Sequence, residues 1–242
     1  MAQPAQHAGA AARAPAPVEV ATLRGGAGVL RRLRHTRREI EAIAALAPAG
    51  EVLVATDFAA DRELVLSGAL DGYRVVHFAT HGVLDDEHPE LSGLVLSQVD
   101  ADGSAKNGFL RLRDVYGLEL AADLVVLSGC QTALGREVRG EGLVGLTRGF
   151  LYAGVEQVLA SLWRVEDRAT AELMERFYRA LWLDGLRPAA ALARAQRELA
   201  ADPRWSDPYY WGAFVVQGAS RRPAPAAAPA PGSDSPVRDG RR

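Results

Sequence analysis

The chain has 242 residues, 48% of them hydrophobic, which suits one domain of the α/β kind with a substantial core. Its net charge of −2 provides no field that would steer it onto nucleic acid, so we expect no nucleic-acid partner. The single cysteine excludes an internal disulfide and favours a reducing compartment, the cytoplasm. No apolar run of about 18 residues and no signal-peptide pattern occurs, so we expect no membrane partner.

The two ends of the chain differ in composition from its centre. Residues 1–17 and 219–242 are rich in Ala and Pro and show no hydrophobic periodicity. We therefore expect a disordered leader and a disordered tail on a domain that spans residues 18–218. Arginine and alanine are abundant while lysine is nearly absent, a bias typical of a GC-rich bacterial genome.

A cluster of arginines precedes the first predicted helix. Five arginines fall between Arg31 and Arg38, which could form a nucleic-acid patch. However, Thr36 and Glu39 have the spacing of a capping box, and apolar residues follow at helical spacing. We interpret the arginines as the solvated start of a helix.

The next segments predict a βαβ unit. Glu51–Ala55 and Tyr73–Thr80 have the composition of buried strands, and Asp61–Leu70 that of a helix between them. The two strands should be parallel, with a right-handed crossover. A further buried strand, Asp123–Leu127, consists mainly of apolar β-formers.

The remaining predicted elements alternate between strands and helices. They are a strand at 94–96, a strand at 109–110, a helix at 112–120, a helix after Gly142, a strand at 155–162, a helix opened by Glu166 or Asp167 and closed by Gly185, a helix from Pro188, and a strand at 214–217. This order predicts an α/β fold with a mostly parallel sheet and helices on both faces.

Two of the predicted strands end in reactive side chains. His81 follows Tyr73–Thr80, and Cys130 follows Asp123–Leu127 after a small-residue turn. Open α/β folds build their sites at the carboxyl ends of the strands, so we expect the imidazole and the thiol to be neighbours, as a Cys–His dyad requires. His81 precedes Cys130 by about 50 residues, a spacing similar to that of caspases.

Each of these residues has an alternative interpretation. A lone cysteine such as Cys130 often only fills space in a core. His77 lies on an apolar face of its predicted strand, where a hydrogen-bonded core histidine is the more frequent case. His88, in an acidic loop, is a weak rival to His81 as the base.

Five blocks of sequence resemble one family. They are H-F-A-T-H-G, L-V-V-L-S-G-C-Q-T-A-L-G, G-L-V-G-L-T-R-G-F-L-Y-A-G, A-S-L-W-R-V-E-D-R-A-T and D-P-Y-Y-W-G-A-F-V-V-Q-G, in this order over about residues 30 to 218. They look like the CHAT family of caspase-like domains, relatives of caspases, gingipains and separase. The resemblance implies a caspase-like three-layer sandwich and a cysteine endopeptidase.

The resemblance also implies roles for individual residues. His81 and Cys130 match the catalytic dyad, and Gly82 and Cys130 match the backbone N–H donors of the oxyanion hole. Ser128 stands where caspases have a pocket glutamine, so an aspartate preference is not expected. Asp167 matches an aspartate that in separase meets a substrate arginine; alternatively, Asp167 only caps the helix that it precedes.

The resemblance leaves two classes of function open. We favour a cysteine endopeptidase that cleaves a protein substrate and is regulated, through a regulatory or sensor protein, within a bacterial signalling or defence system. The alternative is a caspase-like scaffold or interaction module in which cleavage is lost or incidental. We expect no metal and no cofactor.

Overall fold

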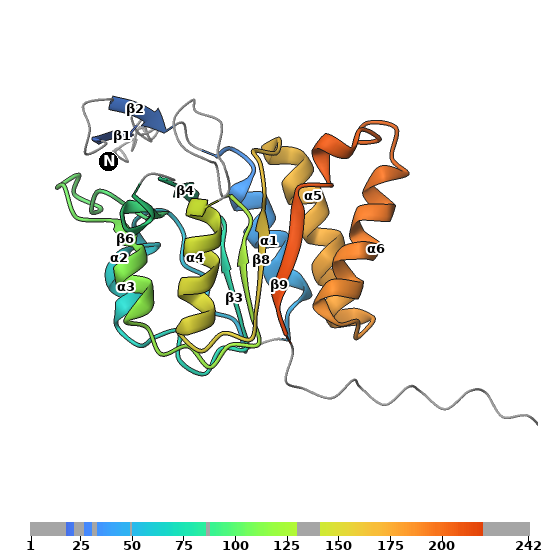
Figure 1. Ribbon diagram of the computed structural model, residues 1–242, viewed down its shortest axis with the longest axis horizontal. Helices are drawn as coiled ribbons and strands as arrows, with labels where there is room; N and C mark the ends of the chain where they lie inside the picture. The colour runs from blue at the N-terminus through green and yellow to red at the C-terminus, as the bar shows by residue number, and fades with distance from the viewer. Residues whose placement is uncertain are drawn as a thin grey trace, which may run out of the picture.

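The structure, a computed structural model, describes residues 18–21, 27–30, 33–48, 50–85, 88–129 and 141–219. Its centre is a four-stranded sheet in the order β3-β7-β8-β9 (Figure 1). The strands are β3 (Val75–Phe78), β7 (Leu124–Leu127), β8 (Gln157–Ser161) and β9 (Phe214–Gly218). The pairs β3–β7 and β7–β8 are parallel, whereas β9 runs antiparallel to β8.

Helices cover both faces of this sheet (Figure 1). One face is covered by α2 (Arg62–Leu66), α3 (Leu112–Tyr116) and α4 (Glu141–Tyr152), and the other by α1 (Thr36–Leu46), α5 (Asp167–Tyr178) and α6 (Pro188–Ala200). The mostly parallel sheet with helices on both faces confirms the predicted α/β class.

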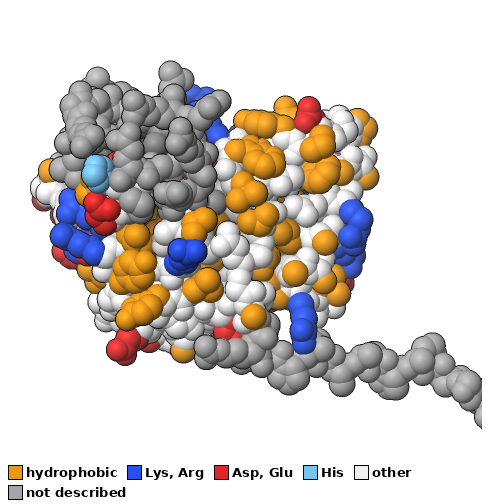
Figure 2. Space-filling view, in the orientation of Figure 1, with side chains coloured by type: hydrophobic (Ala, Val, Ile, Leu, Met, Phe, Trp, Pro, Cys, Tyr) orange, Lys and Arg blue, Asp and Glu red, His pale blue; other side chains and the backbone are white. Residues whose placement is uncertain are grey.

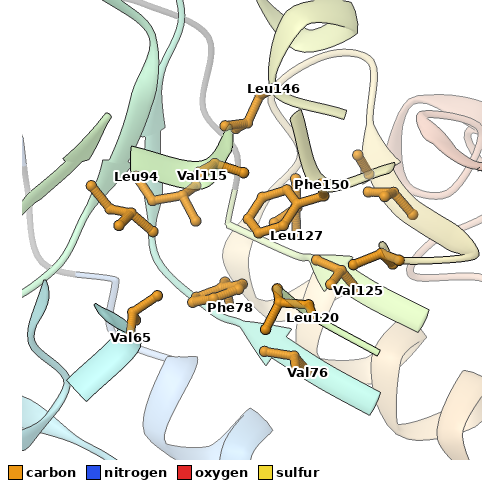
Figure 3. Packing of buried hydrophobic residues seen from close by; sticks show 14 of the residues in the cluster. Val65, Val76, Phe78, Leu94, Val115, Leu120, Val125, Leu127, Leu146 and Phe150 are labelled. Atoms are coloured by element: carbon orange, nitrogen blue, oxygen red, sulfur yellow. The ribbon is translucent and has the colours of Figure 1, made fainter. Parts of the chain in front are cut away.

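The pleat of β7 divides the core into two clusters. Val125 and Leu127 pack with α2, α3 and α4, whereas Leu124 and Val126 pack with α1, α5 and α6. In the first cluster the rings of Phe78 and Phe150 face each other, with centroids 5.7 Å apart (Figure 3). All four β7 side chains are at most 1% exposed, as expected for a central strand buried on both faces.

Two smaller sheets complete the strands. The first consists of β4 (His81–Val83), β5 (Gly93–Val95) and β6 (Phe109–Arg111), all antiparallel. The second is the antiparallel pair β1 (Val18–Ala21) and β2 (Ala27–Leu30). Short helical segments lie at Asp57–Ala59, Pro89–Leu91, Arg179–Leu183 and Pro208–Tyr210.

The strand predicted at Glu51–Ala55 is not formed. The segment has no β pairing, and the side chains of Val52, Leu53 and Val54 are 41%, 44% and 49% exposed. The turn that follows it is held elsewhere, because the Ser97 amide donates to the carbonyl of Ala60 (2.8 Å). A groove therefore separates this segment from the outer edge of β3, and the predicted βαβ unit is absent.

Two helix predictions also needed correction. The capping box at Thr36 and Glu39 is absent: α1 has His35 as its N-cap without a side-chain bond, and Glu39 is buried at 3% exposure instead. The helix predicted at Asp61–Leu70 is the shorter α2, which ends at Leu66. Asp61 is its N-cap, and the Asp61 carboxylate accepts from the Leu64 amide. Turns follow α2 because the chain reaches Gly68, which has a φ of +80°.

Part of the outer surface is apolar. Figure 2 shows hydrophobic side chains over α3 and α4. Tyr116 and Tyr152 are 42% and 76% exposed there, and their rings stack edge to face with centroids 5.4 Å apart. The carboxyl ends of α3 and α4 therefore present an aromatic pair to solvent.

Candidate active site

His81 lies at the carboxyl end of β3. It is the first residue of β4, where it pairs with Val95, and the Thr80 hydroxyl donates to the Val95 carbonyl. Its imidazole is half-buried, with Nδ1 shielded from solvent, and it lines the groove beside β3, which has a volume of about 3110 Å³. The β4 pairing of His81 and the bond from the Thr80 hydroxyl fix the backbone that carries its imidazole at that groove.

The end of β7 contacts the end of β3. The Ser128 amide donates to the Phe78 carbonyl (3.1 Å), and Gly129 packs directly on Thr80. A Cβ at Gly129 would lie only 2.4 Å from the Thr80 oxygen. Cys130 lies outside the described residues, but the residue before it touches the residue before His81.

This contact predicts a stability effect. We expect Gly129→Ala to lower the free energy of unfolding by about 1–3 kcal/mol, because its methyl group would have to push backbone away from backbone. Gly117→Ala is the matched control: the added Cβ would meet its nearest atom at 3.4 Å, and Gly117 has an ordinary φ of −88°. Urea denaturation of both variants tests this, and equal stabilities would contradict the close approach at Thr80.

A buried polar network lies behind the ends of these strands. His77 Nε2 is 2.9 Å from Glu39 Oε1 and 3.1 Å from Ser128 Oγ, and Nδ1 is 3.0 Å from Tyr178 Oη. Burial, and next the charge of Glu39, raise the pKa of Tyr178 well above its usual value, so this phenol keeps its proton. It can therefore donate to Nδ1 while Nε2–H donates to Glu39. His77 is thus a hydrogen-bonded core residue.

Glu39 belongs to this network, which its sequence pattern did not predict. Its capping-box interpretation directed the carboxylate to the backbone at the start of α1, whereas the side chain points into the core. One signal was present: Glu39 lies four residues before the buried Ile43 and so shares its helix face.

Asp167 and Ser128 meet at a second, much smaller cavity of about 20 Å³. Its nine lining residues are Leu33, Thr36, Glu39, Ser128, Gly129, Ser161, Val165, Asp167 and Thr170. Two of these residues are acidic and, among the described residues that line it, none is basic. A space of this size has room for about one water molecule. Asp167 also lines the large groove that His81 borders.

The helix-cap alternative for Asp167 is wrong in the structure. Glu166 is the N-cap of α5, and its carboxylate accepts from the Ala169 amide (2.7 Å). The Asp167 carboxylate instead accepts from the His35 amide (2.7 Å), which joins the start of α5 to the start of α1. Asp167 lines both cavities, while this bond holds one of its carboxylate oxygens.

Other features of the described residues bear on function. His88 pairs with Glu90 across 3.4 Å, and its side chain is 39% exposed. No group of three or more His, Cys, Asp or Glu side chains in the described ranges has the arrangement of a metal site. Within the same ranges, no helix combines the length and the apolar character needed to cross a bilayer.

Known proteins match this chain over two different extents. Tetratricopeptide repeat protein 28 of Mus musculus is 40% identical over 109 residues, and its Homo sapiens counterpart 38% over 109 residues. In both cases the match covers 45% of this chain but only 4% of the relative. The CHAT domain family matches over residues 2–219, which include every described element. The chain therefore belongs to the CHAT domain family.

Proposed function

We propose that the protein is a cysteine endopeptidase whose dyad consists of His81 and Cys130. One observation supports this most: Gly129, directly before the candidate nucleophile, packs on Thr80, directly before the candidate base. A thiol and an imidazole on the residues that follow these two can reach each other across the ends of adjacent parallel strands. The groove beside His81 gives an extended protein substrate access to that edge.

In this proposal the thiolate of Cys130 is the nucleophile. The His81 imidazolium lowers the thiol's pKa from its ordinary value of about 8.5, and the thiolate attacks the scissile carbonyl carbon. The oxyanion formed is stabilised by the backbone N–H groups of Gly82 and Cys130, each worth roughly 3 to 4 kcal/mol of barrier. His81 then gives its proton to the leaving amine, and water hydrolyses the acyl-enzyme.

We further propose that Asp167 and Ser128 contact the substrate residue that precedes the cut. Both line the small acidic cavity next to Gly129. The substrate would be another protein, and a regulatory or sensor protein would control cleavage within a bacterial signalling or defence system in the cytoplasm.

The test is cleavage of a peptide library by the wild type beside Cys130→Ala. We expect cleavage at defined positions by the wild type and none by the variant, because the chain has no second thiol to replace the first. Circular dichroism should show that both proteins are folded. Cleavage by Cys130→Ala at the wild-type rate would show that the activity has another origin.

The second candidate function is a protein-interaction module. Two observations favour it: the curated relatives are named for tetratricopeptide repeats, and the aromatic pair Tyr116 and Tyr152 is exposed on α3 and α4. The two candidates differ in what Cys130→Ala does. Loss of the thiol would abolish a peptidase function but leave partner binding through α3 and α4 intact.

A further inference from the structure

We propose that Glu39, His77 and Tyr178 are positioning residues that hold Ser128, and with it the end of β7 from which Cys130 emerges. This inference rests on the proposed function, because it assigns these residues to the geometry of the same dyad. The network joins four elements that are distant in sequence: α1, β3, the turn after β7, and α5.

The network is buried throughout. The side chains of His77 and Glu39 are 8% and 2% exposed, and Tyr178 and Ser128 are 0% and 5% exposed. A carboxylate at such depth is costly unless it is hydrogen-bonded, and replacing all four residues with apolar ones would give an ordinary core. The polar set therefore requires a reason other than packing.

The position of Ser128 suggests that reason. Its amide donates to the Phe78 carbonyl (3.1 Å), and its hydroxyl oxygen lies 3.1 Å from His77 Nε2, where it shares the single Nε2–H with Glu39, so both its backbone and its side chain are bound to β3. Gly129 continues this contact onto Thr80. His77 lies on β3, which leads to His81. The His77 imidazole therefore sets the spacing between the end of β3, before His81, and the end of β7, before Cys130.

Glu39 and Tyr178 act on Ser128 through His77. Tyr178 Oη holds Nδ1, and Glu39 holds Nε2, so the ring cannot rotate away from the Ser128 hydroxyl without breaking two buried hydrogen bonds. The tilted packing of the Tyr178 ring on His77 (5.6 Å between centroids) restricts the ring further.

The experiment measures the pH–rate profile of iodoacetamide alkylation in four variants: Ser128→Ala, Tyr178→Phe, Glu39→Leu and Glu39→Gln. Cys130 is the only cysteine, so the label reports on it alone. We expect Ser128→Ala, Tyr178→Phe and Glu39→Leu to slow alkylation at pH 6 by about tenfold or more, since a displacement of about 1 Å can cost about 100-fold. Glu39→Gln keeps an oxygen that accepts from Nε2–H and should stay within about threefold of the wild type.

Controls separate positioning from a loss of stability. Val155→Ala removes buried surface in the turn that leads into β8 and should lower the melting temperature without moving the pH–rate profile. All rates are measured well below each variant's melting temperature. A merely structural network would lower melting temperatures and leave the profiles unchanged, which would overturn the inference.

The outcomes also separate this inference from the proposed function. Fast alkylation in the wild type and in the three disruptive variants, with slow alkylation only in His81→Ala, would leave the dyad in place and overturn the positioning role. Wild-type alkylation no faster than that of a free cysteine would overturn both.

Discussion

Iodoacetamide is expected to alkylate Cys130 at pH 6 far faster than it alkylates a free cysteine, and His81→Ala should remove this difference. A thiol with a pKa of about 8.5 is only about 0.3% thiolate at pH 6. If His81 forms an ion pair with the thiol, the thiolate fraction rises, and we expect a rate at least about tenfold higher. A more acidic thiolate is also a weaker nucleophile, so the gain is smaller than the change in ionisation alone.

The matched control is His88→Ala, which removes the rival base. The His88 side chain is 39% exposed and pairs with Glu90, so its loss should leave the alkylation rate unchanged. A slow rate in His88→Ala together with a normal rate in His81→Ala would reverse the assignment of the base. On a cleaved peptide, His81→Ala should lower kcat by at least about 100-fold, the range expected for losing a positioned acid–base group.

Much of the central sheet could be predicted because its signals are local. Leu124–Leu127 is a run of four apolar residues, which is typical of a strand buried on both faces, and Gln157–Ser161 follows a helix at the spacing of a crossover. Glu51–Ala55 is also mainly apolar, yet it pairs with no described strand. The position of this segment depends on the contacts of the turn that follows it. That turn is tied to Ser97 by a contact far along the chain, which composition does not report.

The residues of the candidate site also divide into those that local sequence signals predict and those that they do not. The two strands that precede His81 and Cys130 could be placed side by side, because each has a strong local signal, and β3 and β7 are indeed neighbours. The role of Glu39 could not be predicted, because Thr36 and Glu39 have the spacing of a capping box. Only the presence of His77 and Tyr178 in the folded chain decides that the Glu39 carboxylate points into the core. The Asp167 contact with the His35 amide joins residues 132 positions apart and has no local signal.

Asp167, if it binds the substrate residue before the cut, should favour arginine or lysine at that position. The small cavity beside Gly129 has Asp167 and Glu39 on its wall and no basic residue among the described residues that line it. An arginine or lysine side chain would supply the missing positive charge, whereas an acidic residue would meet like charges. The cavity holds about 20 Å³, so the walls must open to admit such a side chain.

Three variants test this preference. Asp167→Asn removes the charge but keeps an oxygen that can accept from the His35 amide, so it should abolish the basic preference with little loss of stability. Asp167→Ala should abolish the preference and also lower the stability by about 1 kcal/mol, because the His35 bond is lost. Glu166→Ala removes the N-cap of α5, at a similar cost of about 1 kcal/mol, and should leave the preference unchanged.

Cleavage preference and melting temperature, measured on the same three proteins, separate the charge of Asp167 from its structural bond. Iodoacetamide labelling of Cys130 should be the same in all of them, because the dyad is untouched. A basic preference that persists in Asp167→Asn would assign the specificity to another carboxylate, such as Glu39, which also lines the cavity. A wild type that cuts after leucine or another apolar residue would exclude a basic pocket while leaving the His81 and Cys130 proposal intact.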